Sequence, residues 1–273
     1  MNLSVSNIAW PVEVDEQALA LVRKAGITAV EVAPTRIWPD WAGASAVSAA
    51  EVARNFGPLG FRISSLQSIL FGKPECKLFG SDEERRSLFD HLALCAEVAT
   101  ALGAVNLVFG APKNRTLCGK SEADAFQIAC EFFRAVGDYF DLRGLCLCLE
   151  PNAPQYGCEF VTNSAQASRL IRAVDSGGFR LHLDTGCMHL AGEDPVLAIH
   201  AHADILRHFH VSEPFLGGFE DPAVLHRNVS RALEDVGYSN WVTLEMRATA
   251  RPLEALARAL EALVENYSAM AVA

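Results

Sequence analysis

The stretch FRLHLDTGCMHLAGEDP, residues 179–195, begins as an apolar strand and ends in polar side chains. Side chains alternate between the two faces of a strand, so Leu181 and Leu183 share one face while His182 and Asp184 share the other. The leucine face is typical of a strand packed against helices. The other face predicts that the strand delivers a carboxylate to a polar cavity.

The rest of the chain repeats this pattern. Strand-length apolar runs alternate with segments of helical period, and strands that alternate with helices form parallel sheets. Eight such units in 273 residues match a (β/α)₈ TIM barrel, so the predicted fold is a single α/β domain over residues 1–273. A doubly wound open sheet is the alternative, and the lack of a glycine-rich phosphate turn after the first strand argues against it. The predicted strands are 3–10, 28–34, 61–70, 104–112, 145–151, 179–186, 207–214 and 241–247, and the main predicted helices are 15–26, 82–103, 122–141, 163–178 and 194–206.

The composition limits the class of protein. Hydrophobic residues make up 51% of the chain and charged residues only 21%, so a substantial core can form. The formal net charge of −10 disfavours nucleic-acid binding, which depends on clustered Lys and Arg. Eight cysteines without CxxC pairs indicate reduced thiols, and neither a basic targeting region nor a membrane-length apolar run is present. We expect a cytoplasmic protein without nucleic-acid or membrane partners, and a homo-oligomer is compatible with the sequence.

Acidic and imidazole side chains lie near the ends of the last four predicted strands. Glu150, Asp184, His210 and Glu245 share the inward face, and barrel enzymes build their active sites at the carboxyl ends of the strands. Neighbouring carboxylates repel one another unless a cation balances them. Three carboxylates and one imidazole suit Mn²⁺, Mg²⁺ or Co²⁺, with Zn²⁺ as a further candidate.

The same four strand ends resemble the motifs of the xylose isomerase-like TIM barrels. This superfamily includes sugar phosphate isomerases/epimerases, ketose 3-epimerases, hydroxypyruvate isomerase and inosose dehydratase. The resemblance extends over essentially the whole chain. It implies one divalent cation, with Mn²⁺ favoured, bound by Glu150, Asp184, His210 and Glu245, and a carbohydrate-like small-molecule substrate. The motifs that carry it are LEPN (149–152), LHLDTG (181–186), HFHVSEP (208–214) and LEMR (244–247).

The chain departs from this pattern at Cys187. Ketose epimerases usually have a substrate-binding His three residues after the strand-6 Asp, and AP endonucleases have a metal-binding His there. His189, two residues further on, is a candidate to compensate. The departure argues for an isomerase or lyase outside both of these branches.

The two glutamates suggest a reaction. Proton transfer beside a carbonyl needs a base and a conjugate acid, and Glu150 and Glu245 on opposite sides of a metal could supply both. The resulting hypothesis is a metal-dependent isomerase or epimerase that acts through an enediolate on a keto-sugar, sugar acid or related polyol. A lyase that dehydrates a keto-polyol is the alternative. A DNA-repair endonuclease or a non-catalytic sugar-binding barrel is less consistent with the charge and the complete ligand set.

Other polar residues are candidates for substrate contact. Lys113 and Arg115 lie in the loop FGAPKNR after strand 104–112 and could bind a carboxylate or phosphate. The further substrate-binding candidates are Gln67, Glu213 and His189. Glu31 shares the inward position of Gln67 and could hydrogen-bond substrate hydroxyls or form a structural hydrogen bond. Supporting or core positions are expected for His182 and His208, while Thr243 and Arg247 share the inward face of the last strand. An apolar wall over a sugar ring could include Trp10, Trp38, Trp41 and Phe71.

Overall fold

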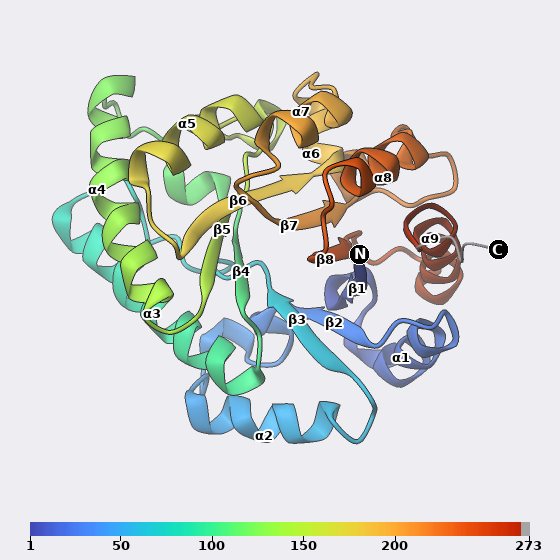
Figure 1. Ribbon diagram of the computed structural model, residues 1–273. Coiled ribbons are helices and arrows are strands. Elements are labelled where there is room, and N and C mark those ends of the chain that lie inside the picture. The colour runs from blue at the N-terminus through green and yellow to red at the C-terminus, as the bar shows by residue number, and fades with distance from the viewer. Residues whose placement is uncertain (269–273) are drawn as a thin grey trace.

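The computed structural model describes residues 1–268, and eight parallel strands in it close into a barrel (Figure 1). β1 pairs with β2 on one side and with β8 on the other. This closure confirms the predicted TIM barrel and excludes the open doubly wound sheet, which would leave two edge strands. The strands are β1 Asn2–Ser6, β2 Ala29–Val32, β3 Arg62–Leu66, β4 Asn106–Phe109, β5 Cys146–Leu149, β6 Phe179–Asp184, β7 Leu206–Val211 and β8 Trp241–Leu244.

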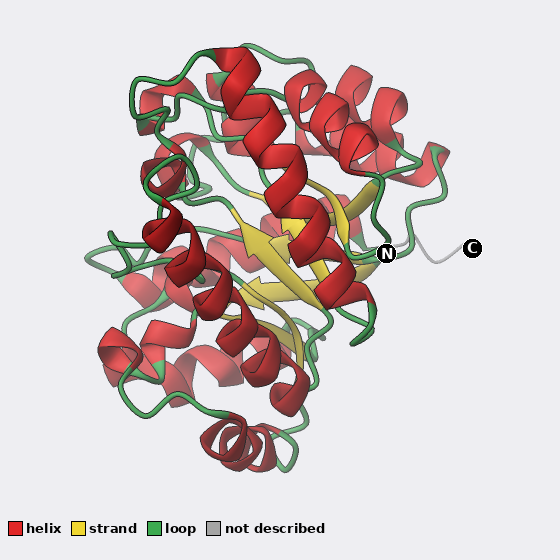
Figure 2. Cartoon of the chain, turned by 90° about the vertical axis from the view of Figure 1, so that its left-hand side faces the viewer, coloured by secondary structure: helices red, strands yellow, loops and turns green. Residues whose placement is uncertain are grey.

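The helices lie outside the strands, as Figure 2 shows from the side. They are α1 Asp15–Lys24, α2 Ala46–Phe56, α3 Asp82–Leu102, α4 Glu122–Asp141, α5 Ser164–Val174, α6 Thr185–Leu190, α7 Pro195–His202, α8 His226–Asp235 and α9 Pro252–Tyr267. Short 3₁₀ turns follow most strands, at η1 Asn7–Ala9, η2 Val12–Val14, η3 Pro34–Arg36, η4 Pro39–Trp41, η5 Pro112–Arg115, η6 Pro154–Tyr156 and η7 Pro214–Leu216.

Local sequence signals explain where the longest helix begins and ends. Ser81 and Glu84 form a reciprocal capping box at the start of α3. Gly103 ends the helix with φ +78°, a left-handed conformation that glycine adopts without strain. The helix predicted over 82–103 is therefore confirmed to within one residue.

The two faces of the strands separate as the alternation predicts. Leu147, Leu181, Phe209 and Val242 are fully buried in the hydrophobic core between strands and helices. The barrel interior is polar and also buried, and it includes Ser4, Ser64, His182, His208 and Thr243. Within it the Ser64 hydroxyl donates to Ser4 Oγ over 3.0 Å, so hydrogen bonds satisfy part of this interior.

Strand register brings the polar strand ends together. Asp184 at the end of β6 is the partner of His210 in β7. β5 ends at Leu149 and β8 at Leu244, so Glu150 and Glu245 are the first residues beyond their strands. Arg247 lies further out and is exposed, because β8 stops before it; its predicted inward position is wrong.

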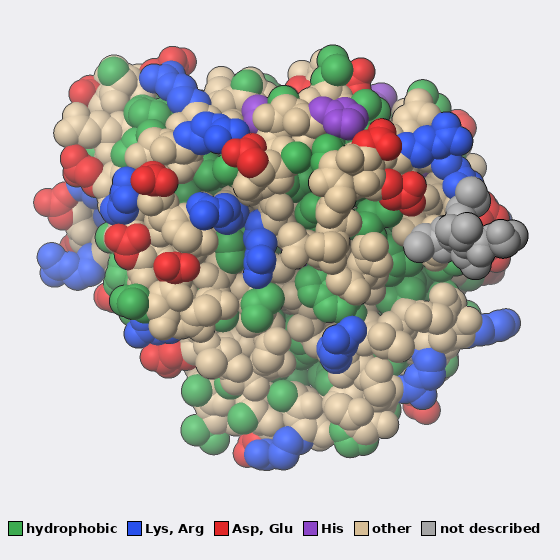
Figure 3. All heavy atoms as spheres, viewed as in Figure 1, with side chains coloured by type: hydrophobic (Ala, Val, Ile, Leu, Met, Phe, Trp, Pro, Cys, Tyr) green, Lys and Arg blue, Asp and Glu red, His purple; other side chains and the backbone are tan. Residues whose placement is uncertain are grey.

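The surface in Figure 3 mixes acidic and basic side chains on the face shown, with Lys and Arg scattered among Asp and Glu. All eight cysteines are free thiols, as the lack of CxxC pairs predicts.

Among residues 1–268, no helix has the length and hydropathy needed to span a membrane.

Candidate metal centre

Four side chains from four neighbouring strand ends converge at the carboxyl end of the barrel. Each offers one nitrogen or oxygen atom, and these four atoms all lie within 4.8 Å of one another. Three are carboxylates and one is an imidazole, and all four residues are buried. The residues are Glu150, Asp184, His210 and Glu245, as the sequence predicts.

Asp184 is fixed by two hydrogen bonds. The Cys187 backbone N–H donates to Oδ1 over 2.6 Å, and the Ser212 hydroxyl donates to Oδ2 over 2.7 Å. The start of α6 must approach β7 closely for this arrangement, since a Cβ on Gly186 would lie 2.6 Å from Ser212 Oγ. Asp184 therefore enters the cavity in one orientation.

Two neighbours position Glu150: Arg115 binds its backbone carbonyl, and Gly110 lies against its carboxylate. Arg115 Nη2 donates to the Glu150 carbonyl over 2.9 Å and to Asn152 Oδ1 over 2.8 Å. A Cβ on Gly110 would lie 2.3 Å from Glu150 Oε2, so a larger residue at position 110 would displace this carboxylate from its present position. The loops after β4 and β5 thus both contribute to the position of Glu150.

His210 presents its two ring nitrogens to different groups. Nδ1 faces the ligand cluster, 3.2 Å from Glu245 Oε2. Nε2 lies 2.9 Å from Glu31 Oε1, within ion-pair distance, although the N–H is not aligned as a hydrogen bond. Glu31 Oε2 accepts from Ser65 Oγ over 2.6 Å and lies 2.9 Å from His208 Nε2. A carboxylate beneath the imidazole favours a proton on Nε2 and leaves Nδ1 free to act as a ligand.

The pKa shifts show the electrostatic cost of this cluster. Burial, together with the charges of Asp184 and Glu245, raises the pKa of Glu150 to about 8. Burial and the charge of Glu245 raise the pKa of Asp184 to about 6. Burial opposes protonation of His210, but the carboxylates of Glu31 and Glu245 raise the pKa of its imidazole well above the usual value. The site concentrates more negative charge than it can stabilise alone, which fits a divalent cation.

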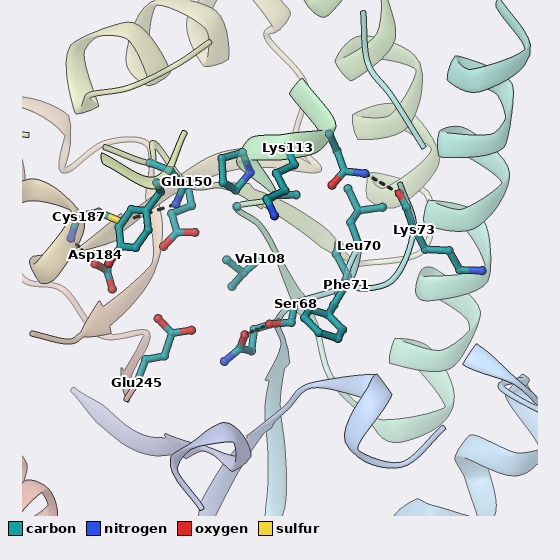
Figure 4. Close-up of a pocket in the computed structure, with 18 of the residues that line it drawn as sticks. Ser68, Leu70, Phe71, Lys73, Val108, Lys113, Glu150, Asp184, Cys187 and Glu245 are labelled. Carbon is teal, nitrogen blue, oxygen red and sulfur yellow. Dashed lines mark hydrogen bonds between the residues drawn. The ribbon is translucent and has the colours of Figure 1, made fainter. Parts of the chain in front are cut away.

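A cavity of about 590 Å³ opens from the ligand cluster to the surface. Figure 4 shows Glu150, Asp184 and Glu245 together at one end of it, with Asp184 between the two glutamates. The remaining wall comes from the β3–α3 loop, the end of β4, η5, the β5–α5 loop with η6, α6 and η7. Its lining includes Gln67, Ser68, Leu70, Phe71, Val108, Lys113, Asn152, Tyr156, Cys187 and Leu216.

The family profile described as xylose isomerase-like TIM barrel matches residues 19–266. The chain belongs to this family. No curated protein sequence matches it significantly. Structures with the same fold include a D-psicose 3-epimerase determined in the presence of D-fructose, with TM-score 0.81, 15% identity and coverage of 98% of this chain and 100% of that chain. The 3-keto-D-glucoside 4-epimerase from E. coli, in its apo form, has TM-score 0.80, 18% identity and coverage of 97% and 99%. A probable 3-DHS dehydratase from Bacillus anthracis has TM-score 0.72, 12% identity and coverage of 97% and 99%.

Two of the predicted substrate residues of this xylose isomerase-like barrel do line the cavity. The Gln67 amide donates to Ser6 Oγ over 2.6 Å, which fixes its side chain at the end of β3. Lys113 is exposed, and Figure 4 shows its side chain directed into the cavity. No carboxylate of the described chain forms an ion pair with Lys113.

Arg115 does not line the cavity. Its side chain is fully buried, and its guanidinium donates to the carbonyl of Glu150, to Asn152 and to Cys158 Sγ. The prediction of a direct substrate contact is therefore not met, because the η5 turn directs this side chain into the protein. Arg115 instead supports the loop that carries Glu150.

Glu213 and His189 also lie outside this cavity. Glu213 Oε1 is 2.7 Å from His226 Nε2, and its other oxygen accepts from the Ala223 backbone N–H, so the side chain braces the β7–α8 loop. His189 is exposed at the end of α6 and lines a separate cavity beside α7 and α8. It does not compensate for Cys187, because α6 turns it away from the ligand cluster.

The two other inward histidines are buried beside the ligand cluster, and only one of the four predicted aromatic residues lines the cavity. His182 and His208 are fully buried beside His210, with ring centroids 4.1 and 5.3 Å from its ring. Burial lowers the pKa of His182, and neither of its ring nitrogens has a hydrogen-bond partner within the described chain. Phe71 lines the cavity as expected, whereas the wall role is not met for Trp10, Trp38 and Trp41, which lie in the core.

Three residues of the site were missed by the sequence analysis. Ser212 lies two residues after His210, so the alternation of side chains along a strand places both on the same inward face, and this signal could have identified Ser212. Asn152 lies within the LEPN motif and contacts Cys187 Sγ at 3.6 Å, and it was passed over because only the glutamate was assigned. Tyr156 lies in η6 and carried no local signal, since its position depends on how the loop folds back over the cavity.

Proposed function

We propose that this protein is a divalent-metal-dependent isomerase or epimerase of a keto-sugar, sugar acid or related polyol. The observation that carries the proposal is the convergence of Glu150, Asp184, His210 and Glu245 at one wall of an open cavity. Three carboxylates and one imidazole favour Mn²⁺, and Mg²⁺, Co²⁺ or Zn²⁺ are further candidates. Bound there, the cation would stabilise negative charge on the oxygens of an enediolate. Similar folds in sugar epimerases support this class of reaction.

The two glutamates have the arrangement that proton transfer needs. Glu150 and Glu245 reach the ligand cluster from either side of Asp184, so one can remove a proton from the carbon beside a carbonyl while the other returns a proton on the opposite face (Figure 4). Asp184, held by two hydrogen bonds, acts as a fixed ligand.

Substrate recognition falls to residues around the cavity. Gln67 and Asn152 can hydrogen-bond hydroxyl groups next to the reacting carbons. Lys113 can bind a carboxylate or phosphate, because its ammonium group has no carboxylate partner within residues 1–268. The proposed substrate is thus a carbohydrate-like molecule that can carry a negative charge.

Deuterium exchange tests the proposed reaction. Mn²⁺-loaded protein is incubated with a panel of keto-sugars and sugar acids in D₂O, and uptake at a carbon beside the carbonyl is followed by NMR. Glu150→Gln and Glu245→Gln should each lower the rate of exchange or of product formation at least ~10²-fold at saturating metal. Asp184→Asn should act through metal affinity, and excess Mn²⁺ should partly restore it. Full turnover by both glutamine variants would contradict the assignment.

A metal-dependent dehydratase is the second candidate, and Tyr156 is the observation that favours it. Its side chain lines the cavity, and burial raises the pKa of its phenol, so the hydroxyl stays protonated. A protonated phenol could donate to a departing hydroxyl after the same first proton removal. Loss of water from the substrate, seen by mass spectrometry, distinguishes this reaction from epimerisation, which conserves mass.

A further inference from the structure

The cavity extends well beyond the ligand cluster. One continuous space of about 590 Å³ connects the carboxylates to a second wall formed by residues 67–74 of the β3–α3 loop and by η5. Figure 4 shows Leu70 and Phe71 on the side opposite Asp184. Pro74 and Pro112 add apolar surface to the same wall. A cavity of this size and composition suits a molecule with both a polar and an apolar part.

Three buried side chains from separate elements hold this loop in place. Trp41 Nε1 of η4 donates to the Phe71 carbonyl over 3.1 Å. His91 Nε2 of α3 lies 2.7 Å from the Ile69 carbonyl, and its ring packs edge-on against Trp41. Asn114 Nδ2 of η5 donates to the Lys73 carbonyl over 2.7 Å. The loop is therefore a preformed wall, because side chains distant in sequence fix its carbonyl groups.

The loop leaves a large aromatic ring exposed. Phe71 is 69% exposed, although hydrogen bonds fix the loop around it. Ser68 adopts φ +53°, a left-handed conformation unfavourable for a serine, and Gly72 adopts φ +78°. Exposure of an aromatic ring on a fixed, strained loop beside an open cavity is typical of a binding surface.

We propose that Phe71, with Leu70, Pro74 and Pro112, forms a subsite for an apolar substituent on the sugar substrate. The inference rests on the proposed function and names the substrate class: a sugar derivative with a flat apolar group, such as an aryl glycoside. A free monosaccharide presents hydroxyl groups on its remaining carbons, and these would face an apolar wall with few polar partners. The occupant is part of the same molecule because the subsite and the ligand cluster share one cavity.

Paired ligands that differ only in the substituent test this subsite. The probes are methyl and phenyl glycosides of 3-keto-glucose and 3-keto-galactose, in both anomers, titrated by calorimetry into Mn²⁺-loaded protein. At least one phenyl probe should bind at least ~10-fold tighter than its methyl partner, the effect of burying about one small apolar side chain. Phe71→Ala should reduce this ratio to below ~3-fold, and Phe71→Tyr should keep it.

The control is Leu142→Ala, which removes an 86% exposed side chain at the opposite end of the barrel and should leave the ratio unchanged. Metal content is measured in every variant. The proposal is overturned if no phenyl probe gains affinity, or if the gain persists in Phe71→Ala. It is also overturned if Phe71 instead maintains a dimer that Phe71→Ala dissolves, because a second copy would then cover this surface.

Two outcomes separate this inference from the proposed function. If free keto-sugars undergo exchange and their phenyl derivatives have the same kcat/KM, the proposed reaction stands and the subsite proposal is wrong. If phenyl probes bind in a Phe71-dependent way but no sugar undergoes deuterium exchange, the subsite proposal stands and the proposed reaction is wrong.

Discussion

Among single residues, Glu31 shows how a buried side chain can support a candidate metal centre without being one of its ligands. It is fully buried, and its two oxygens face His210 Nε2 and His208 Nε2 at 2.9 Å each. Burial alone would raise the pKa of Glu31, but the two imidazoles hold it well below the usual range. An ionised carboxylate at this point orients the His210 ring and keeps Nδ1 directed at the carboxylates.

We therefore predict that Glu31→Gln lowers Mn²⁺ affinity about 10-fold or more, the usual effect of losing such a supporting carboxylate. Calorimetric titration with Mn²⁺ measures the affinity, and NMR of the imidazole nitrogens of the Mg²⁺-loaded protein reports whether His210 keeps its proton on Nε2. Ser65→Ala is the matched control, since it removes one hydrogen bond to Glu31 and keeps the charge. Equal affinity in the wild type and Glu31→Gln would show that Glu31 only fills space.

At the scale of elements, the η5 turn directs two neighbouring cations to opposite destinations. Lys113 is exposed and enters the cavity, whereas Arg115, two residues on, is fully buried and bonded to the β5 loop. Asn114, between them, holds the β3–α3 loop through the carbonyls of Lys73 and Cys76. One short turn thus links three parts of the site. Lys113 is the candidate anion-binding residue, Arg115 supports the loop that carries Glu150, and Asn114 holds the apolar wall.

The different positions of Lys113 and Arg115 predict different effects of the same substitution, one on substrate binding and the other on stability. Arg115→Met should lower the free energy of unfolding by ~2–4 kcal/mol, because Glu150 O and Asn152 Oδ1 lose their donor. Lys113→Met should leave stability within ~0.5 kcal/mol and raise KM for an anionic substrate more than for its neutral analogue. Urea unfolding and steady-state kinetics on both variants check this. An equal KM effect of Lys113→Met on both substrates would assign the lysine to the surface alone.

At the scale of the whole molecule, the barrel collects charge that its fold must stabilise. The strand ends gather three carboxylates in one buried place, and the pKa values of Glu150 and Asp184 rise to about 8 and about 6 as a result. Because these pKa values are higher in the folded protein than the ordinary value of about 4, the folded state holds the protons more tightly than the unfolded chain. Their contribution to stability is complete below about pH 4 and is lost as the pH rises through about 6 and then about 8.

Metal-free protein should therefore lose a few kcal/mol of stability from these groups between pH 5 and pH 8.5. Saturating Mn²⁺ should remove this loss, since a cation stabilises the ionised carboxylates, and the gap in Tm between loaded and metal-free protein should widen with pH. Scanning calorimetry at several pH values measures the gap. Glu150→Gln should flatten the pH dependence of the metal-free protein. A constant gap across this range would mean that the carboxylates are not strained in the metal-free state.

The order of residues is enough to predict the barrel and the four strand ends that form the candidate metal centre. Strand periodicity assigns Leu181 and Asp184 to opposite faces, and the alternation of strands with helices brings all carboxyl ends to one edge. These are local or sequential properties, so the order of residues is sufficient to state them.

Which loop side chains belong to the site depends on the folded chain. Lys113 and Arg115 have the same local signals, and the difference between them comes from the carbonyl of Glu150, 35 positions away from Arg115. His189 and Glu213 follow β6 and β7, which carry Asp184 and His210, but their side chains are turned toward α7 and α8. Tyr156 lines the cavity although no local pattern predicts it. The direction of a loop side chain depends on contacts with distant segments, and such contacts exist only after the barrel has closed.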